Sequence, residues 1–227
     1  SQPERIDFSA LENDNVDSLL HLENKGRLVF EDFVKMVPSQ HFLTTLTKLQ
    51  RRWNISLEAG CHSLIDAYIL EAVEFDPDKK EEKTYDETTD RLAVYPEYYV
   101  KPVRISDDLQ LTGPIDYITA NRKERVFDKL KQGTSIVASP TFCTIEAKEM
   151  RRFSAGEGEV LGQMLASAKN ADGMRWTFYY VDEEGYYRSK IYTVEVEQGV
   201  VLGILRHWVR GQLPSSNFSK GTRKVFK

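Results

Sequence analysis

The sequence predicts an α/β (α+β) fold, in which helices and a β-sheet share one core. Hydrophobic residues make up 41% of the 227 residues and aromatic residues 11%, which is typical of a folded globular protein. The helical spacing of apolar residues and the alternation typical of strands occupy separate stretches of the chain. A chain of this length can bury one sizeable core, so we expect one domain with an N-terminal extension.

Composition and charge narrow the class of protein further. No apolar run in the sequence approaches the 18 or more residues that a membrane span needs, and residues 1–5 do not resemble a signal peptide. The net charge of −4 gives no general argument for a polyanionic partner. The two cysteines, Cys61 and Cys143, lie outside the spacings of zinc sites and disulfide frameworks. We therefore expect a soluble intracellular protein, in the nucleus or the cytoplasm, with no membrane partner.

Residues 1–53 are expected to form an N-terminal helical extension. Residues 1–30 are polar and acidic, with one short helix predicted around residues 17–22. After Pro38, apolar residues recur at three- and four-residue steps, which predicts a helix. These residues are Phe42, Leu43, Leu46, Leu49 and Trp53.

Residues 54–212 are expected to form the main domain, and its first helix has the clearest pattern in the chain. The helix runs over residues 54–73, with Asn54 or Ser56 as its N-cap. Its apolar face consists of Leu57, Cys61, Leu64, Ile65, Tyr68 and Ile69. The acidic and polar residues that follow, 74–90, predict a loop.

A meander of three strands comes after this loop. Alternating apolar residues predict the strands over residues 92–103, 109–120 and 135–149. Helical spacing returns after Gly156, and this helix is expected to end near residues 170–173. Its apolar face consists of Val160, Leu161, Met164, Leu165 and Ala168.

The last part of the domain is predicted to hold two strands and a helix. The strands, residues 175–181 and 186–196, are joined by a turn in which Gly185 has a positive φ. The helix covers residues 199–211. The basic tail, residues 213–227, is expected to be frayed.

Ionisable residues interrupt two of the predicted strands. Asp116 lies inside an apolar strand, where an aspartate is costly unless it is paired or binds a cation. Its alternative role is that of a turn residue. Glu146 and Lys148 are two positions apart, so their side chains share one face of the next strand. The alternative for this pair is an ordinary surface ion pair.

The two strands together predict a metal site if they are neighbours in the sheet. Asp116 and Glu146 would then converge, and two carboxylates that close need a hard cation such as Mg²⁺ or Mn²⁺. The main-chain carbonyl of Ile145 would supply a further oxygen. Lys148 would hold an attacking water or offset the charge on a phosphate. This combination is typical of metal-dependent phosphodiester hydrolysis.

The pattern resembles the active site of the PD-(D/E)XK nuclease superfamily. The matching residues are Gly113, Pro114 and Asp116, then Glu146, Ala147 and Lys148, then a helix that carries Gln163. The resemblance implies the restriction-endonuclease-like α-β-β-β-α-β core over about residues 54–182, with a central mixed sheet flanked by helices. It is similar in overall arrangement to nuclease-like domains of fungal and effector proteins.

The resemblance also implies roles for individual residues. Asp116 and Glu146 would bind the metal, Lys148 would be the catalytic lysine, and Gln163 would assist catalysis. Many members carry a glutamate of the metal shell on the first core helix, where this chain has Glu58. The sequence departs from the family at Ile115, because the family has proline directly before the aspartate.

The leading hypothesis is therefore a Mg²⁺- or Mn²⁺-dependent nuclease that cuts DNA in preference to RNA, with a homodimer left open. Nucleic-acid contacts are expected from Arg122, Lys123, Arg151 and Arg152, whose alternative is plain exposure to solvent.

Two other functions stay open. One is a catalytically silent nuclease-like module that binds nucleic acid or protein. The other is an RNA endonuclease of the cap-snatching type, in which a histidine joins the metal shell; His62 is the histidine that lies near in this chain. The structural alternatives are a helix first-turn acid for Glu58, a surface residue for Gln163 and a satisfied, half-buried histidine for His62.

Overall fold

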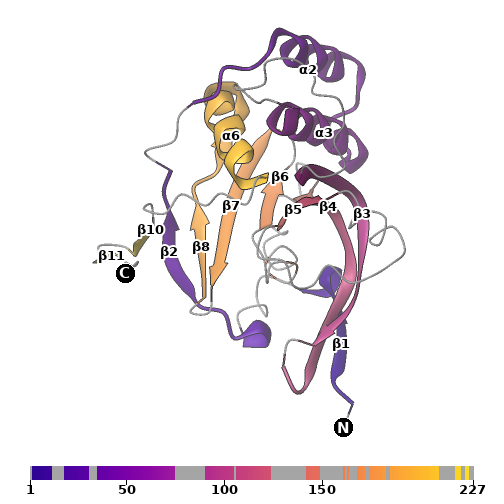
Figure 1. The fold of residues 1–227 in the computed structure, drawn as a ribbon, viewed down its shortest axis with the longest axis vertical. Coiled ribbons are helices and arrows are strands. Elements are labelled where there is room, and N and C mark those ends of the chain that lie inside the picture. Colours follow the sequence, from indigo (N-terminus) through magenta and orange to yellow (C-terminus); the bar gives the residue numbers. More distant parts are fainter. Residues whose placement is uncertain are drawn as a thin grey trace.

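The structure is a computed structural model, and it shows an α+β protein. It describes residues 2–11, 18–30, 35–74, 90–104, 106–123, 142–148, 161, 163, 168–171, 174–182, 185–209, 218–220 and 223–224. Two mixed sheets share strand β7, and the helices gather over one end of them (Figure 1). The predicted α+β class is thus confirmed.

Three α-helices of the described residues cover the sheets. They are α2 (Gln40–Arg52), α3 (Glu58–Glu74) and α6 (Val194–Val209). Helices α2 and α3 confirm the two helices predicted in residues 42–73. Trp53 and Leu57, expected on apolar faces, are instead 52% and 55% exposed, because both lie in the connection between α2 and α3. None of the helices in the described part of the chain combines the length and the hydropathy that crossing a membrane requires.

The first sheet contains the predicted meander. Its strands are β3 (Asp90–Arg104), β4 (Leu109–Lys123), β5 (Phe142–Ala147), β6 (Ala168–Ala171) and β7 (Arg175–Asp182), with β1 (Glu4–Asp7) at one edge. β3, β4 and β5 pair antiparallel in sequence order, as predicted. β5 and β6 pair parallel, β6 and β7 pair antiparallel, and β1 runs parallel to β4.

The second sheet extends from the other edge of β7. Its further strands are β8 (Gly185–Ser189), β2 (Asn24–Leu28), β10 (Phe218–Lys220) and β11 (Arg223–Lys224), and β9 (Tyr192–Thr193) also pairs with β7. Gly185 opens β8 with φ 147°, which confirms the predicted positive φ. A Cβ at this position would lie 2.1 Å from the carbonyl oxygen of Glu23, so the close approach of the chain before β2 requires glycine.

Several elements differ from their predictions. Residues 1–30 contain β1, a 3-10 helix η1 (Phe8–Ala10) and β2, where a helical extension was expected. The short helix predicted around residues 17–22 is present over residues 18–20. Short polar strands carry little alternation, and their pairing partners lie far along the chain. The helical state is retained at Leu161 and Gln163, but residues 168–171 form β6 because they bridge β5 and β7.

The end of the domain differs as well. The predicted strand over residues 186–196 is divided into β8 and β9, and α6 begins at Val194, five residues earlier than expected. Glu195 and Glu197 lie in the first turn of this helix, where the helix dipole favours acidic residues. The tail, expected to be frayed, contributes the strand pair β10 and β11 in its described part.

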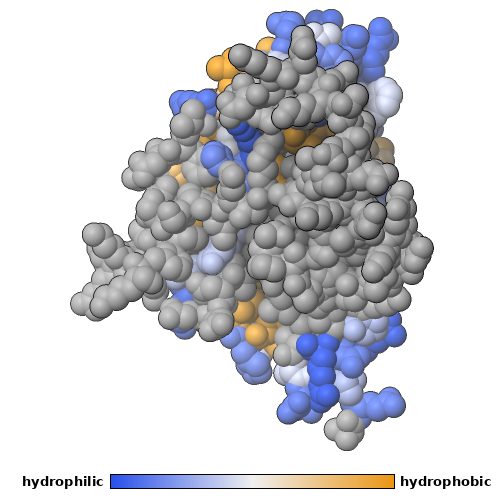
Figure 2. All heavy atoms as spheres, viewed as in Figure 1, coloured by the Kyte–Doolittle hydropathy of each residue, from blue (hydrophilic) through white to orange (hydrophobic). Residues whose placement is uncertain are grey.

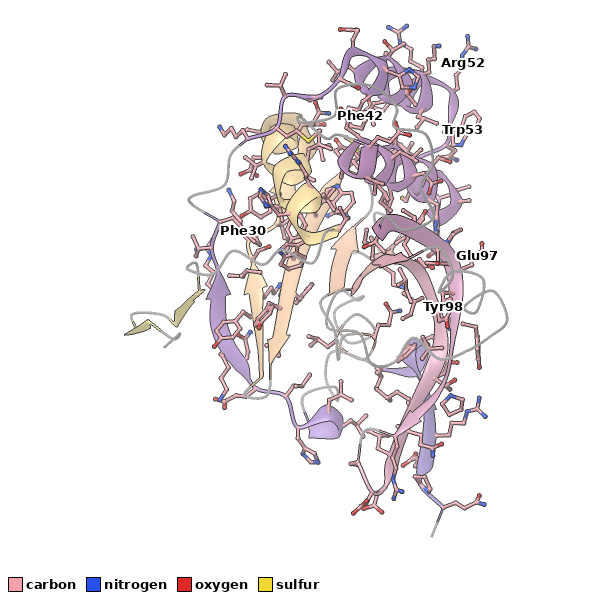
Figure 3. The ribbon with its side chains drawn as sticks, viewed as in Figure 1. Phe30, Phe42, Arg52, Trp53, Glu97 and Tyr98 are labelled. Carbon is pink, nitrogen blue, oxygen red and sulfur yellow. The ribbon has the colours of Figure 1, made fainter. Side chains whose placement is uncertain are left out.

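An aromatic core joins the helices to β7. Phe178 of β7 lies edge-on to Phe30, with ring centroids 5.7 Å apart, and to Trp208 of α6, with centroids 5.5 Å apart. Phe42 of α2 packs against Tyr68 of α3, with centroids 5.0 Å apart. Phe30 and Phe42 point inward, whereas Arg52 and Trp53 lie at the outer end of α2 (Figure 3). In the space-filling view, hydrophilic residues gather over α2 and over the lower end of β3 and β4 (Figure 2).

We expect Ser39→Ala to lower the free energy of unfolding by about 1 kcal/mol, measured by urea denaturation. Ser39 is the N-cap of α2: its Oγ accepts from the Phe42 N–H at 3.1 Å and donates to Glu71 Oε2 at 2.8 Å. Thr44→Ala is the matched control, because the exposed Thr44 hydroxyl donates only to a carbonyl of its own helix. An equal loss in both variants would contradict the capping role.

Candidate active site

The centre of the candidate site is the contact between β4 and β5. The Asp116 carboxylate, 23% exposed, accepts a hydrogen bond through Oδ2 from the Ala147 N–H at 2.6 Å. Tyr117 pairs with Ile145, so Asp116 and Glu146 lie one residue beyond the last registered pair of the two strands. The expected neighbourhood of these strands is confirmed.

Glu146 lies in β5, and Lys148 directly follows this strand. The backbone of Glu146 pairs with Asn170 of β6, and its side chain lies outside the described residues. Lys148 directly follows β5 and is half-buried. Its ammonium is close enough to Asp116 to favour the ionised carboxylate. The structure therefore brings Asp116 and Lys148 to one place and brings the backbone of Glu146 beside them.

Helix α3 adds two residues to this place. His62 directs Nε2 toward Asp116 Oδ2, at a distance of 4.0 Å. Glu58, one turn earlier in the first turn of α3, is exposed, and its charge acts unfavourably on the Asp116 carboxylate. Gly60 allows the chain at Asn54 to cross this turn closely, since a Cβ there would lie 2.1 Å from the Asn54 carbonyl oxygen. The start of α3 is therefore fixed beside β4.

The electrostatics of the site are dominated by the burial of one carboxylate. Burial raises the pKa of Asp116 above its usual value, and the neighbouring Glu58 raises it further. The Ala147 N–H, His62 and Lys148 lower it without cancelling the effect of burial. A cation bound at Asp116 would relieve this unfavourable burial of charge.

Tyr117 lies directly behind the site and is 3% exposed. Its Oη is 2.9 Å from His62 Nδ1 and donates a hydrogen bond of 3.3 Å to the main-chain oxygen of His62. Burial raises the pKa of Tyr117 far above its usual range, and the Asp66 carboxylate adds to the effect. The phenol therefore keeps its proton at neutral pH.

The other predicted residues are placed as follows. Gln163 is only 5% exposed, so it is a buried residue and its alternative role as a surface residue is wrong. For Arg122 and Lys123 the structure describes the backbone, which pairs with Arg91 and Asp90 of β3. The predicted phosphate contacts Arg151 and Arg152 lie outside the described residues.

The sequence interpretation named His62 only for the cap-snatching alternative and did not consider Tyr117, whose Oη lies 2.9 Å from His62 Nδ1. A signal was present: Glu58, His62 and Asp66 recur every four residues, which places them along one line of α3. Because α3 is rich in apolar residues, the sequence alone does not show whether this line of polar residues faces the solvent or the sheet. The structure shows that the middle of this line faces β4.

The described donor atoms could supply part of the coordination shell of a hard divalent cation. Among the residues whose side chains are described, no three His, Cys, Asp or Glu are grouped to hold a metal, and Glu146 is not one of these residues. His62 Nε2 and Asp116 Oδ2 are 4.0 Å apart, which is less than twice the bond length of about 2.1 Å that nitrogen and oxygen ligands make to such ions. One ion can therefore contact both atoms. Glu58 does not complete a group of three with them, and the side chain of Glu146 lies outside the described residues.

A cleft of about 610 Å³ lies elsewhere, between β2 and α6. Its cationic residues are Arg27, Lys35 and Lys190, and Lys190 forms an ion pair with Glu197 on the same wall. None of the described residues of the candidate site lines this cleft. Its chemistry does not bear on Asp116.

We expect Asp116→Asn to stabilise the metal-free protein at neutral pH. The folded-state pKa of Asp116 is raised, so the stabilising contribution is fully present below the unfolded value of about 3.9 and is lost as the pH rises through the folded pKa. The amide of the variant does not ionise, so the variant does not lose this stability as the pH rises. Its side-chain oxygen can still accept the hydrogen bond from the Ala147 N–H. Urea denaturation in EDTA at several pH values measures the difference, which should disappear under acidic conditions. A variant less stable than the wild type at pH 7 would contradict the pKa direction.

Comparison of this chain with models of protein families, with curated proteins and with solved structures finds no match.

Proposed function

We propose that this protein is a Mg²⁺- or Mn²⁺-dependent nuclease that hydrolyses phosphodiester bonds, with DNA as its substrate. The observation that carries the proposal is the 2.6 Å hydrogen bond from the Ala147 N–H to Asp116 Oδ2. It fixes the carboxylate of β4 against the middle residue of Glu146-Ala147-Lys148. Two acids and a lysine in this relation are the set needed for metal binding and water activation.

The order and pairing of the elements support a restriction-endonuclease-like core. Helix α3 precedes the antiparallel strands β3, β4 and β5, and β6 then returns parallel to β5. A parallel return requires a crossover connection, and the described residues of that connection, Leu161 and Gln163, are helical. This order of the described elements supports the proposed α-β-β-β-α-β core.

In the proposed mechanism the residues of the chain have separate roles. Asp116 and Glu146 would hold the divalent ion, which supplies Lewis acidity at the phosphate when bound. Lys148 holds a water for attack on phosphorus and offsets the negative charge that develops on the phosphate oxygens. A new P–O bond forms to this water, which releases a proton to solvent. The bond to the leaving sugar oxygen breaks, and solvent returns a proton to that oxygen. Tyr117 and the buried strands limit the access of other water to the inner side of Asp116.

We expect purified protein to cleave duplex DNA in the presence of Mn²⁺ or Mg²⁺ and to lose this activity completely in excess EDTA, measured by product release from labelled DNA. Asp116→Asn is the matched control, because it removes a metal-binding charge and preserves the volume of the side chain. Cleavage that persists in EDTA or in this variant would overturn the proposal. Calorimetry distinguishes the silent module, for which no Asp116-dependent heat of Mn²⁺ binding is expected.

The position of His62 favours a second candidate, an RNA endonuclease of the cap-snatching type. Such enzymes resemble the first candidate in their carboxylate and lysine chemistry and add a histidine ligand. His62 Nε2 is 4.0 Å from Asp116 Oδ2, which is where such a ligand would be needed. Parallel assays on single-stranded RNA and duplex DNA separate the candidates: faster cleavage of RNA, lost in His62→Ala, would favour the second.

A further inference from the structure

The cleft between β2 and α6 combines cationic and apolar residues. Its volume of about 610 Å³ lies in the range of small-molecule sites. Phe30, which follows β2 and lines the cleft, lies beside α6 (Figure 3). The other apolar residues of the lining include Leu28, Val196 and Val200. A cleft of this composition suits a ligand that has a charged group and an apolar body.

The cationic residues of the cleft come from three separate segments. Arg27 lies in β2, Lys35 precedes α2, and Lys190 lies between β8 and β9. The Arg27 and Lys35 side chains are exposed, and among the described residues neither has an ion pair or a side-chain hydrogen bond. Glu197 is the one acid in the described lining, so three cations and one acid leave a charge of +2. The cleft is therefore positive, although the whole chain has a net charge of −4.

Tyr192 shows that these charges lie close together. Lys190 Nζ lies 4.8 Å from the centroid of the Tyr192 ring and also forms an ion pair with Glu197. Burial raises the pKa of Tyr192 to about 12, the Glu197 carboxylate adds to this rise, and the Arg27 guanidinium opposes it. Arg27 and Lys190 thus both act at this phenol, and one anion can interact with both.

Main-chain contacts hold the segment of Lys35 in place. The N–H of Met36 donates to the Gly199 carbonyl oxygen at 3.0 Å, which fixes this segment against α6. Helix α6 has a kink at Glu197, where φ is −121° and ψ is 22°. A helical segment therefore begins beside the cleft, and its dipole adds to the positive potential of the three cations.

We propose that this cleft binds a small organic phosphate, that is, a phosphate monoester on an apolar or aromatic body. Such a phosphate carries a charge of about −1.5 to −2 at pH 7, which complements the cleft, and arginine and lysine are the side chains that bind phosphate. The body would cover apolar residues such as Val196, which is 85% exposed. The inference does not rest on the proposed nuclease function, because none of the described residues around Asp116 lines the cleft.

Calorimetry with phenyl phosphate tests the proposal on the full-length, metal-free protein in a buffer without chelator. We expect phenyl phosphate to bind about 10-fold more tightly than inorganic phosphate, which lacks the apolar body. We expect a similar advantage over phenyl sulfate, which has the same shape and a single negative charge. Absence of phenyl phosphate binding at millimolar concentration would overturn the proposal, and so would equal affinity for phenyl phosphate and phenyl sulfate.

Loss of a cleft cation should weaken binding. Arg27→Gln and Lys35→Gln are each expected to weaken phenyl phosphate binding by about 10-fold, the typical effect of losing a hydrogen bond to a charged group. Both side chains are exposed, so both variants should fold. Lys25→Gln is the matched control, because it removes a lysine of the same strand that does not line the cleft. Unchanged binding in Arg27→Gln and Lys35→Gln, or an equal loss in Lys25→Gln, would overturn the assignment.

A substitution of the opposite sign makes the test specific. Glu197→Gln should tighten phenyl phosphate binding, because it removes the acid of the cleft and releases Lys190 from its ion pair. The amide oxygen can still accept the hydrogen bond that the Thr193 N–H donates to Glu197. General damage to the fold would weaken binding. Weaker binding by a folded Glu197→Gln variant would therefore overturn the electrostatic basis of the proposal.

A nucleic-acid strand is the other anion that a positive cleft could bind. A strand needs an extended positive surface, whereas this cleft is confined and contains Glu197. We therefore expect an oligonucleotide without a terminal phosphate to leave bound phenyl phosphate in place. Displacement of phenyl phosphate by this oligonucleotide would overturn the assignment to a small ligand.

Discussion

Replacing Lys148 by alanine is expected to lower the rate of DNA cleavage by about 10²–10³-fold, because it removes a cation that acts on the charge developing in the transition state. Lys148 follows β5 and acts electrostatically on Asp116, so it lies at the place where the phosphate would bind. The fold should be preserved, since the residue is half-buried at the end of a strand and its backbone is unchanged. Single-turnover kinetics with saturating protein and Mn²⁺ measure the effect on the chemical step.

Two further measurements make the result for Lys148 interpretable. Mn²⁺ binding by the variant should be retained, because the carboxylates remain. Lys25→Ala is the control for loss of a lysine: Lys25 lies in the second sheet and pairs with the exposed Glu23, an interaction expected to contribute little. Undiminished cleavage by Lys148→Ala, or an equal loss in Lys25→Ala, would remove the basis for assigning Lys148 to catalysis.

Trp176→Ala is expected to lower the free energy of unfolding by about 3–5 kcal/mol, which is a large fraction of the total stability of a typical domain. Trp176 is completely buried in β7. Its ring centroid lies 5.5 Å from that of Tyr68 on α3 and 6.3 Å from that of Phe178. The substitution therefore leaves a cavity between α3 and the sheet, and we expect the loss of stability to extend to the helix that carries His62.

The matched control for Trp176 is the same substitution at Trp53. Trp53 is 52% exposed, and its main polar contact is a hydrogen bond from Nε1 to Ser63 Oγ at 2.7 Å. Trp53→Ala should cost about 1 kcal/mol, the typical value of one hydrogen bond. Urea denaturation with a common slope for both variants gives the two values. A smaller loss at Trp176 than at Trp53 would show that the core is centred elsewhere.

Local periodicity explains which elements could be predicted. The helix at residues 58–74 and the strands of the meander are long, and their apolar residues repeat often enough to identify the state. Consecutive strands tend to pair, so Asp116 and Glu146 could be expected beside each other. β1, β2 and β6 have four or five residues each, and their state depends on distant partners that no local pattern reveals.

Part of the candidate site could likewise be predicted from the sequence. Asp116 and Lys148 stand out because charges are rare in apolar strands. Tyr117 does not, since an aromatic residue in a strand is ordinary, and its contact with His62 depends on the packing of α3 over β4.

The pairing of the N-terminal strands has a consequence for the order of folding. β1 pairs with β4 and β2 pairs with β8, so these two strands wait during synthesis for partners that are made much later. Contacts of such large sequence separation form slowly, because a long loop must be closed before they are made. During synthesis β2 would remain unpaired until β8 has left the ribosome. We therefore expect the second sheet to assemble last, after the meander and α3 have brought Asp116 and His62 together.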